Sequence, residues 1–115
     1  IRSLNNKEIK DIIKEKNIKL EIIELRKEAL DKIRGKKKYD LILIEDNIKP
    51  LSGIIIMKKL LIIKSFNTKV ILLSSNNEYI DNYDKYGFSD VISEPIDEDI
   101  FIDKINKYLE RWENS

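Results

Sequence analysis

Carboxylates, hydroxyls and lysines are the side chains of this sequence that could carry chemistry. The chain contains no histidine and no cysteine, which excludes Ser-His-Asp triads, thiolate nucleophiles and metal sites built from either residue type. Two adjacent acids, Glu45 and Asp46, follow the short apolar run 41–44. Two adjacent serines, Ser74 and Ser75, end another apolar run. The acids either form a site or simply end a strand, and the choice depends on the elements that position them.

The hydrophobic pattern alternates between helical and extended segments. Helices are predicted over 5–16, 27–34, 54–63, 76–86 and 97–112, and strands over 18–23, 41–44, 69–75 and 90–93. Alternating helices and buried strands predict a parallel sheet with helices on both faces, which is a doubly wound α/β fold. A length of 115 residues suits one small domain, so residues 1–115 are expected to form a single domain.

A doubly wound sheet would gather the candidate side chains at one edge. The carboxyl ends of parallel strands meet at the same edge, and ligands bind there in open α/β sheets. The loops that leave the predicted strands begin at Glu45, Ser74 and Ser93, and the third loop continues with Glu94. We therefore expect Glu45 and Asp46 to lie near Ser74, Ser75 and Glu94.

The composition excludes several other classes of protein. Lys and Arg number 22 against 21 Asp and Glu, for a net charge of +1, whereas a nucleic-acid binder normally carries a basic face. Apolar runs are strand-sized and fall short of the roughly 18 residues that a membrane span needs. No signal peptide is visible, so a cytoplasmic location is expected.

The order and spacing of several segments resemble the response-regulator receiver domain of two-component signalling. The matching segments are "YDLILIED" with "KPLSG", then "KVILLSS", then "YGFSDVISEPID", and the resemblance extends from residue 5 to about residue 112. It implies a flavodoxin-like receiver fold with an aspartyl-phosphate site after the third strand. It also implies an acid pair that holds Mg²⁺, a Ser or Thr hydroxyl and a Lys on the phosphoryl group, and an aromatic residue that reports the state.

The position of the phosphoryl acceptor depends on how the residues are counted. Counting from Asp40 without gaps places the acceptor position at Glu45, which we favour, whereas counting back from Pro50 places it at Asp46. Glu45 could imitate a phosphorylated aspartate, or it could be an ordinary carboxylate at the end of a strand. The resemblance assigns the hydroxyl position to Ser74, with Ser75 beside it.

Several positions depart from the family pattern. Glu94 occupies the position of the family's lysine, and two carboxylates about 4 Å apart would repel by roughly 4 kcal/mol at an effective dielectric constant of about 20. Lys49 is the candidate for a compensating cation, unless Glu94 simply faces water. Val91 falls at the position of the aromatic switch and lacks its ring. Pro95 is retained, and the resemblance implies a cis peptide bond before it.

The resemblance also implies a first strand followed by the acid pair. By spacing, both would lie at or just before Ile1, so the first strand is expected to be missing from the chain as given. That strand would occupy the centre of the family's sheet. A longer protein, a rearranged domain or another chain would then have to supply it.

These departures favour a degenerate receiver, or pseudo-receiver, that acts as a protein-interaction module without aspartyl phosphorylation. In this interpretation the chain is not an enzyme and has no catalytic residue, cofactor or metal. The alternative is an active receiver that is phosphorylated on Asp46, or at the Glu45 position, with Mg²⁺ and with Lys49 as the cation. A flavodoxin-type small-ligand domain is disfavoured because the glycines form no phosphate-binding cluster.

The expected partner is another protein: a histidine kinase, an output domain or a second copy of the chain. By resemblance, a homodimer would use the surface of the fourth helix, fifth strand and fifth helix. Tyr79, Tyr83, Tyr86 and Phe88 cluster there in the sequence, and exposed aromatic side chains are typical of interfaces, although half or more could be ordinary packing.

Overall fold

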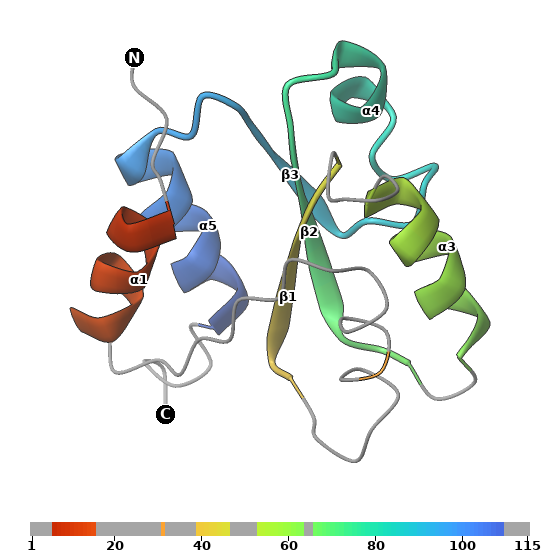
Figure 1. The fold of residues 1–115 in the computed structure, drawn as a ribbon, viewed down its shortest axis with the longest axis horizontal. Coiled ribbons are helices and arrows are strands. Elements are labelled where there is room, and N and C mark those ends of the chain that lie inside the picture. Colours follow the sequence, from red (N-terminus) through yellow and green to blue (C-terminus); the bar gives the residue numbers. More distant parts are fainter. Residues whose placement is uncertain (1–5, 16–30, 32–38, 47–52, 64–65, 110–115) are drawn as a thin grey trace. The chain divides into compact units, whose positions relative to one another are not determined.

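The computed structural model describes residues 6–15, 31, 39–46, 53–63 and 66–109 (Figure 1). They belong to two compact units. The sheet unit comprises Ile23–Ser93, and the helical unit comprises Ile1–Ile22 together with Glu94–Ser115. None of the described helices has the length and apolar character required to span a membrane.

Three parallel strands form the sheet of the sheet unit, in the order β1-β2-β3. Their bounds are Leu41–Glu45, Lys69–Ser74 and Asp90–Ser93. The register pairs Glu45 with Leu73 and Ser74 with Ser93, so all three strands end at the same edge. The central strand β2 is buried at every position after Lys69, as its continuous apolar run predicts. The parallel α/β fold is therefore confirmed.

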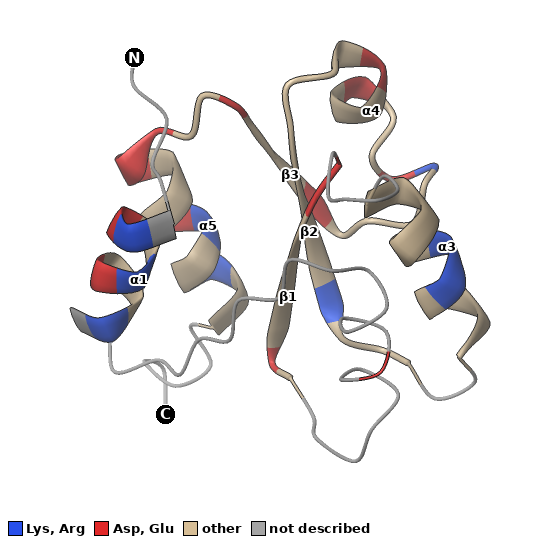
Figure 2. Ribbon diagram, in the orientation of Figure 1, with Lys and Arg blue, Asp and Glu red and all other residues tan. Residues whose placement is uncertain are grey.

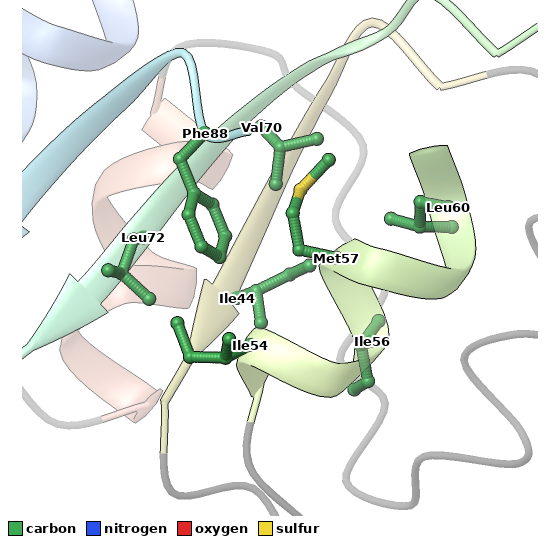
Figure 3. Close-up of a cluster of buried hydrophobic side chains, with 8 residues drawn as sticks. All are labelled: Ile44, Ile54, Ile56, Met57, Leu60, Val70, Leu72 and Phe88. Carbon is green, nitrogen blue, oxygen red and sulfur yellow. The ribbon is translucent and has the colours of Figure 1, made fainter. Parts of the chain in front are cut away.

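Helix α3, Gly53–Ile62, covers one face of this sheet. The bounds of α3 differ by one residue at each end from those of the predicted helix over 54–63. The apolar side chains of α3 pack with side chains from β1 and β2 and with Phe88 (Figure 3). The buried members of this core cluster are Ile44, Ile54, Ile56, Met57, Leu60, Val70, Leu72 and Phe88. The cluster anchors the end of β1 against the start of α3, where the two candidate acids lie.

Helix α4, Asn77–Asp81, is shorter than the predicted helix over 76–86. Asn76 caps its start, because the Asn76 side chain accepts a hydrogen bond from the backbone N–H of Glu78. Beyond Asp81 the chain forms turns, several with hydrogen bonds to the third residue back. The turns end at Gly87, whose φ of 97° suits glycine.

The helical unit contains α1, Asn6–Glu15, and α5, Glu98–Leu109. Both helices lie within the predicted segments 5–16 and 97–112. The buried side chains of α5, Phe101, Ile105 and Leu109, recur every four residues and form one face. Ile100, which was predicted on the same face, is instead 51% exposed because it lies a quarter-turn away.

Several predicted features lie outside the described residues. They include the strand over 18–23, nearly all of the helix over 27–34, and Lys49, Pro50 and Trp112. The expectation that residues 1–115 form one domain, and that its first strand is missing, stays a prediction.

Candidate functional site

The two candidate acids lie at the carboxyl end of β1. Glu45 is the last residue of the strand and its side chain is exposed, whereas Asp46 is half-buried. The backbone N–H of Asp46 donates to the carbonyl of Leu73 at 3.2 Å, which carries the sheet pairing one residue beyond the strand. Successive side chains of a strand point to opposite faces, so only one of the two acids can face a given neighbour.

Asp46 is the acid that meets the predicted hydroxyl. The Ser74 hydroxyl donates a hydrogen bond to Oδ2 of Asp46 at 2.5 Å, within the short range typical of a hydroxyl bound to a carboxylate. Ser74 is fully buried at the end of β2. Its Oγ also accepts a hydrogen bond from the backbone N–H of Asn76 at 2.9 Å. The structure thus brings Asp46 and Ser74 together, while Glu45 and Ser75 are exposed.

Gly53 closes the loop that follows Asp46. Its N–H donates to the carbonyl of Asp46 at 2.8 Å. A Cβ atom at this position would lie 2.1 Å from the Glu45 carbonyl oxygen and 2.4 Å from Cγ2 of Ile44. The start of α3 can approach the end of β1 this closely only because residue 53 is glycine.

Glu78, in helix α4, forms hydrogen bonds with Asn76 and with Tyr86. The hydroxyl of Tyr86 donates to Oε1 of Glu78 at 3.3 Å, and the rings of Tyr79 and Tyr86 meet edge to face with centroids 5.3 Å apart. Desolvation, followed by the negative charge of Glu78, raises the pKa of the Tyr86 phenol above its usual value. Asn76 and Glu78 were not among the predicted site residues, although an asparagine ahead of a helix is a recognisable cap signal.

The other predicted site residues lie further from this pair or in the helical unit. Val91 is half-buried and packs against the core cluster, as an ordinary strand residue would. Glu94 and Pro95 belong to the helical unit, and the peptide bond between them is cis. Asp46 belongs to the sheet unit and Glu94 to the helical unit, so the convergence of Glu94 with Asp46 stays a prediction.

The predicted aromatic cluster divides into one core residue and three partly exposed ones. Phe88 is 4% exposed and belongs to the core cluster, so it is one of the aromatic residues for which ordinary packing, the alternative that the sequence left open, applies. It is buried because the turn at Gly87 directs the chain back toward the sheet. Tyr79, Tyr83 and Tyr86 pack against the same cluster but remain partly exposed.

The charges near the pair are predominantly negative in the described part of the sheet unit. Figure 2 shows acidic residues at the end of β1 and on α4, whereas Lys69 begins β2 at the opposite end of that strand. Among the described residues, no three acidic side chains lie close enough to hold a metal ion together. Mg²⁺ prefers octahedral oxygen ligands, often one or two carboxylates with water. Asp46 could provide one carboxylate, and the described residues by themselves do not build the whole site.

Comparison with known proteins agrees with this geometry. The family model of the response regulator receiver domain matches residues 2–106. A receiver domain from Francisella, response regulator 1452, is 31% identical, with 92% of this chain and 91% of that chain covered and a TM-score of 0.74. A two-component response regulator from Clostridium difficile is 25% identical, with 92% and 87% covered and a TM-score of 0.78.

A more distant similarity shows the fold alone. A structure described as a streptococcal redox sensor evolved from two-component response regulators is 14% identical, with a TM-score of 0.74. The match covers 96% of this chain and 50% of that one. A search of curated proteins found no match.

Proposed function

Because the chain belongs to the response regulator receiver domain family, we propose that it is a degenerate receiver, which binds a protein partner without aspartyl phosphorylation. Receiver domains are in general signalling modules of two-component systems rather than enzymes. The observation that carries this proposal is the hydrogen bond between Ser74 and Asp46.

The Ser74 hydroxyl already has hydrogen-bond partners in the structure. A serine hydroxyl has a single proton to donate, and Ser74 donates it to Asp46 while its oxygen accepts from Asn76. The family resemblance assigns this hydroxyl to the phosphoryl group. If a phosphoryl group formed on Asp46, the fully buried Ser74 would have to exchange its hydrogen bond to the Asp46 carboxylate for a new one.

The charges also support a receiver that is not phosphorylated. A phosphoryl group brings about 1.5 to 2 negative charges at neutral pH, and phosphoryl transfer needs nearby cations to neutralise developing charge. At the position where the family has its lysine, this chain has Glu94. A carboxylate there would repel the group that a lysine would attract.

An active receiver is the second candidate, and one observation favours it. The acid that faces the family's hydroxyl position is an aspartate, Asp46, rather than Glu45. In this alternative Asp46 accepts the phosphoryl group with Mg²⁺, and Lys49 replaces the missing lysine. Lys49 lies outside the described residues.

The proposed partner is a histidine kinase, an output domain or a second copy of the chain, and the proposed location is the cytoplasm, where such partners act. Tyr79, Tyr83 and Tyr86 are partly exposed aromatic residues of the proposed contact surface. A homodimer through the fourth helix, fifth strand and fifth helix, the surface that the family resemblance implies, is one form of this proposal.

Incubation of the protein with a small-molecule phosphodonor and Mg²⁺, followed by intact-mass measurement, tests the proposal. We expect no stoichiometric gain of one phosphoryl group. The Ser74 hydroxyl already donates its proton to Asp46, and Glu94 occupies the position of the family's lysine. A receiver domain with the usual acids and lysine, treated in parallel, should gain that mass and shows that the donor works.

Two matched variants separate the candidates. A stoichiometric adduct that disappears in Asp46→Asn but persists in Glu45→Gln would establish the active receiver and contradict our proposal. An adduct with the reverse pattern would place the acceptor at Glu45 and contradict it equally.

A further inference from the structure

We propose that the exposed faces of α3 and α4 together form a two-fold symmetric interface with a second copy of this chain. In this dimer, α3 of each copy lies against α4 of the other, with Lys58 of one copy opposite Asp81 of the other. The inference rests on the proposed function as a protein-binding module, and it adds which partner binds and which face it uses. It involves no phosphoryl chemistry.

Helix α3 exposes large apolar side chains on the side that faces away from the core. Ile62 is 81% exposed and Leu61 is 57% exposed, whereas the preceding Leu60 is fully buried. Lys58 is exposed and lies one turn before Ile62, so a lysine adjoins the exposed apolar side chains. Adjacent exposed apolar residues with a charged border are typical of protein interaction sites.

Helix α4 and the turn after it carry the opposite charge. Glu78, Asp81 and Asp84 are all exposed, and one lysine, Lys85, lies among them. Figure 2 shows acidic residues on α4 and basic residues on α3. The ring of Tyr83 packs against the core cluster and remains partly exposed between these acids. This face therefore combines negative charge with an aromatic surface.

The two faces adjoin at the turn that ends at Gly87. A Cβ atom at Gly87 would lie 2.6 Å from Cδ1 of Leu61, so the exposed leucine of α3 lies directly beside this turn. Tyr79 and Tyr83 pack against the core cluster to which α3 contributes, so α3 and α4 lie on the same side of the sheet (Figure 1). A two-fold axis between the helices would bring α3 of each copy onto α4 of the other.

The order of the charges favours a second copy as the occupant. Among the residues that the structure describes, Lys58 and Asp81 have no ion-pair partner. A uniformly acidic partner would be attracted by Lys58 and repelled by the acids of α4, and a basic partner would meet the reverse conflict. The occupant must carry both signs in the opposite order beside an apolar surface. A copy related by a two-fold axis presents that order.

Ile62 is the expected anchor of this interface. Burial of its exposed side chain against the aromatic surface of α4 supplies affinity, while the charges on either side set the register. A contact between two short helices is small, and small interfaces are weak and transient. We therefore expect a dissociation constant on the order of 10 to 100 µM.

Sedimentation equilibrium of the full chain over a concentration series tests the interface. We expect a monomer–dimer equilibrium. Ile62→Gln should weaken association by about tenfold, as truncation of an apolar anchor does. The matched control Ile100→Gln, on α5, should change it by less than about twofold. Both side chains are more than half exposed, so both variants should fold.

The variants Lys58→Glu and Asp81→Lys test the charge pairing. Each variant alone places like charges opposite each other twice in its own dimer, which should weaken association by about fivefold. In an equimolar mixture of the two variants, every altered side chain would meet one of opposite charge. The mixture should therefore form a heterodimer close to wild type in affinity, which a charge pair within one chain could not produce.

A wild-type chain that stays monomeric up to about 1 mM would overturn the proposal. Species larger than a dimer would overturn it as well, because a two-fold interface closes at the dimer. So would an Ile100→Gln variant that dissociates as readily as Ile62→Gln, or a mixture without recovery. None of these outcomes affects the phosphodonor experiment. Conversely, a phosphoryl adduct would contradict the proposed function and leave the dimer in place.

Discussion

Gly53→Ala is expected to lower the free energy of unfolding by about 3 kcal/mol, near the upper end of what one added methyl group costs in a packed site. The new Cβ would lie 2.1 Å from the carbonyl oxygen of Glu45 and 2.4 Å from Cγ2 of Ile44. One of these atoms belongs to the backbone, so no rotamer change relieves the overlap. The end of β1 and the start of α3 must separate, which also disturbs Asp46. Urea unfolding followed by circular dichroism measures the loss.

Gly87→Ala is the matched control for this prediction. A Cβ there would meet Cδ1 of Leu61 at 2.6 Å, at the end of a side chain that is 57% exposed and free to move. The remaining cost comes from the positive φ of Gly87 and should be about 1 to 2 kcal/mol. Equal losses for the two variants, or no loss for Gly53→Ala, would contradict the close approach of α3 to β1.

Leu60→Ala is expected to lower the free energy of unfolding by about 2 to 5 kcal/mol, the usual cost of truncating a fully buried leucine. Leu60 is 0% exposed and lies in the core cluster between α3 and the sheet. Small domains are stabilised by only about 5 to 15 kcal/mol, so this loss is a substantial fraction of the total. Thermal and urea unfolding of the full chain measure it.

The adjacent residue offers the control. Leu61 is 57% exposed, so Leu61→Ala should cost less than about 1 kcal/mol. If Leu61→Ala proved as destabilising as Leu60→Ala, the face of α3 that packs on the sheet would be wrongly assigned.

The fold could be predicted from the sequence where apolar runs are long or bounded by turn residues. The strand over 90–93 coincides with β3, and the apolar run of "KVILLSS" is β2 with burial on both faces. The helix over 76–86 was predicted too long, because polar residues after Asp81 suit turns as well as helices. Gly87, which was expected to end this helix, instead ends the turns that follow α4.

The candidate site was harder to predict because neighbouring residues of a strand face opposite ways. A shift of one residue exchanges the roles of Glu45 and Asp46, and residue counting favoured Glu45. The structure instead places Asp46 against Ser74 and leaves Glu45 exposed. The pairing of β1 with β2 determines which of the two acids faces Ser74. A single sequence does not show directly which residues pair between strands.

The hydrogen bonds around Ser74 and Asn76 could not be predicted because they join side chains to particular backbone groups. Asn76 and Glu78 look like ordinary polar residues of a surface helix in the sequence. Their significance comes from the position of Ser74, whose oxygen lies within hydrogen-bond distance of the Asn76 N–H. Sequence spacing alone gives no such distance.

Asp46 and Ser74 form a hydrogen-bonded pair at the carboxyl edge of the sheet, and we propose that this pair does not run a phosphoryl cycle. Titration of ¹⁵N-labelled protein with beryllofluoride and Mg²⁺, which together mimic an aspartyl phosphate, tests this claim most directly. We predict that the amide signals of Asp46, Ser74 and Asn76 stay at their original positions. A saturable second set of signals at these three residues, absent from the Asp46→Asn variant, would contradict the claim and show that the site accepts a phosphoryl group.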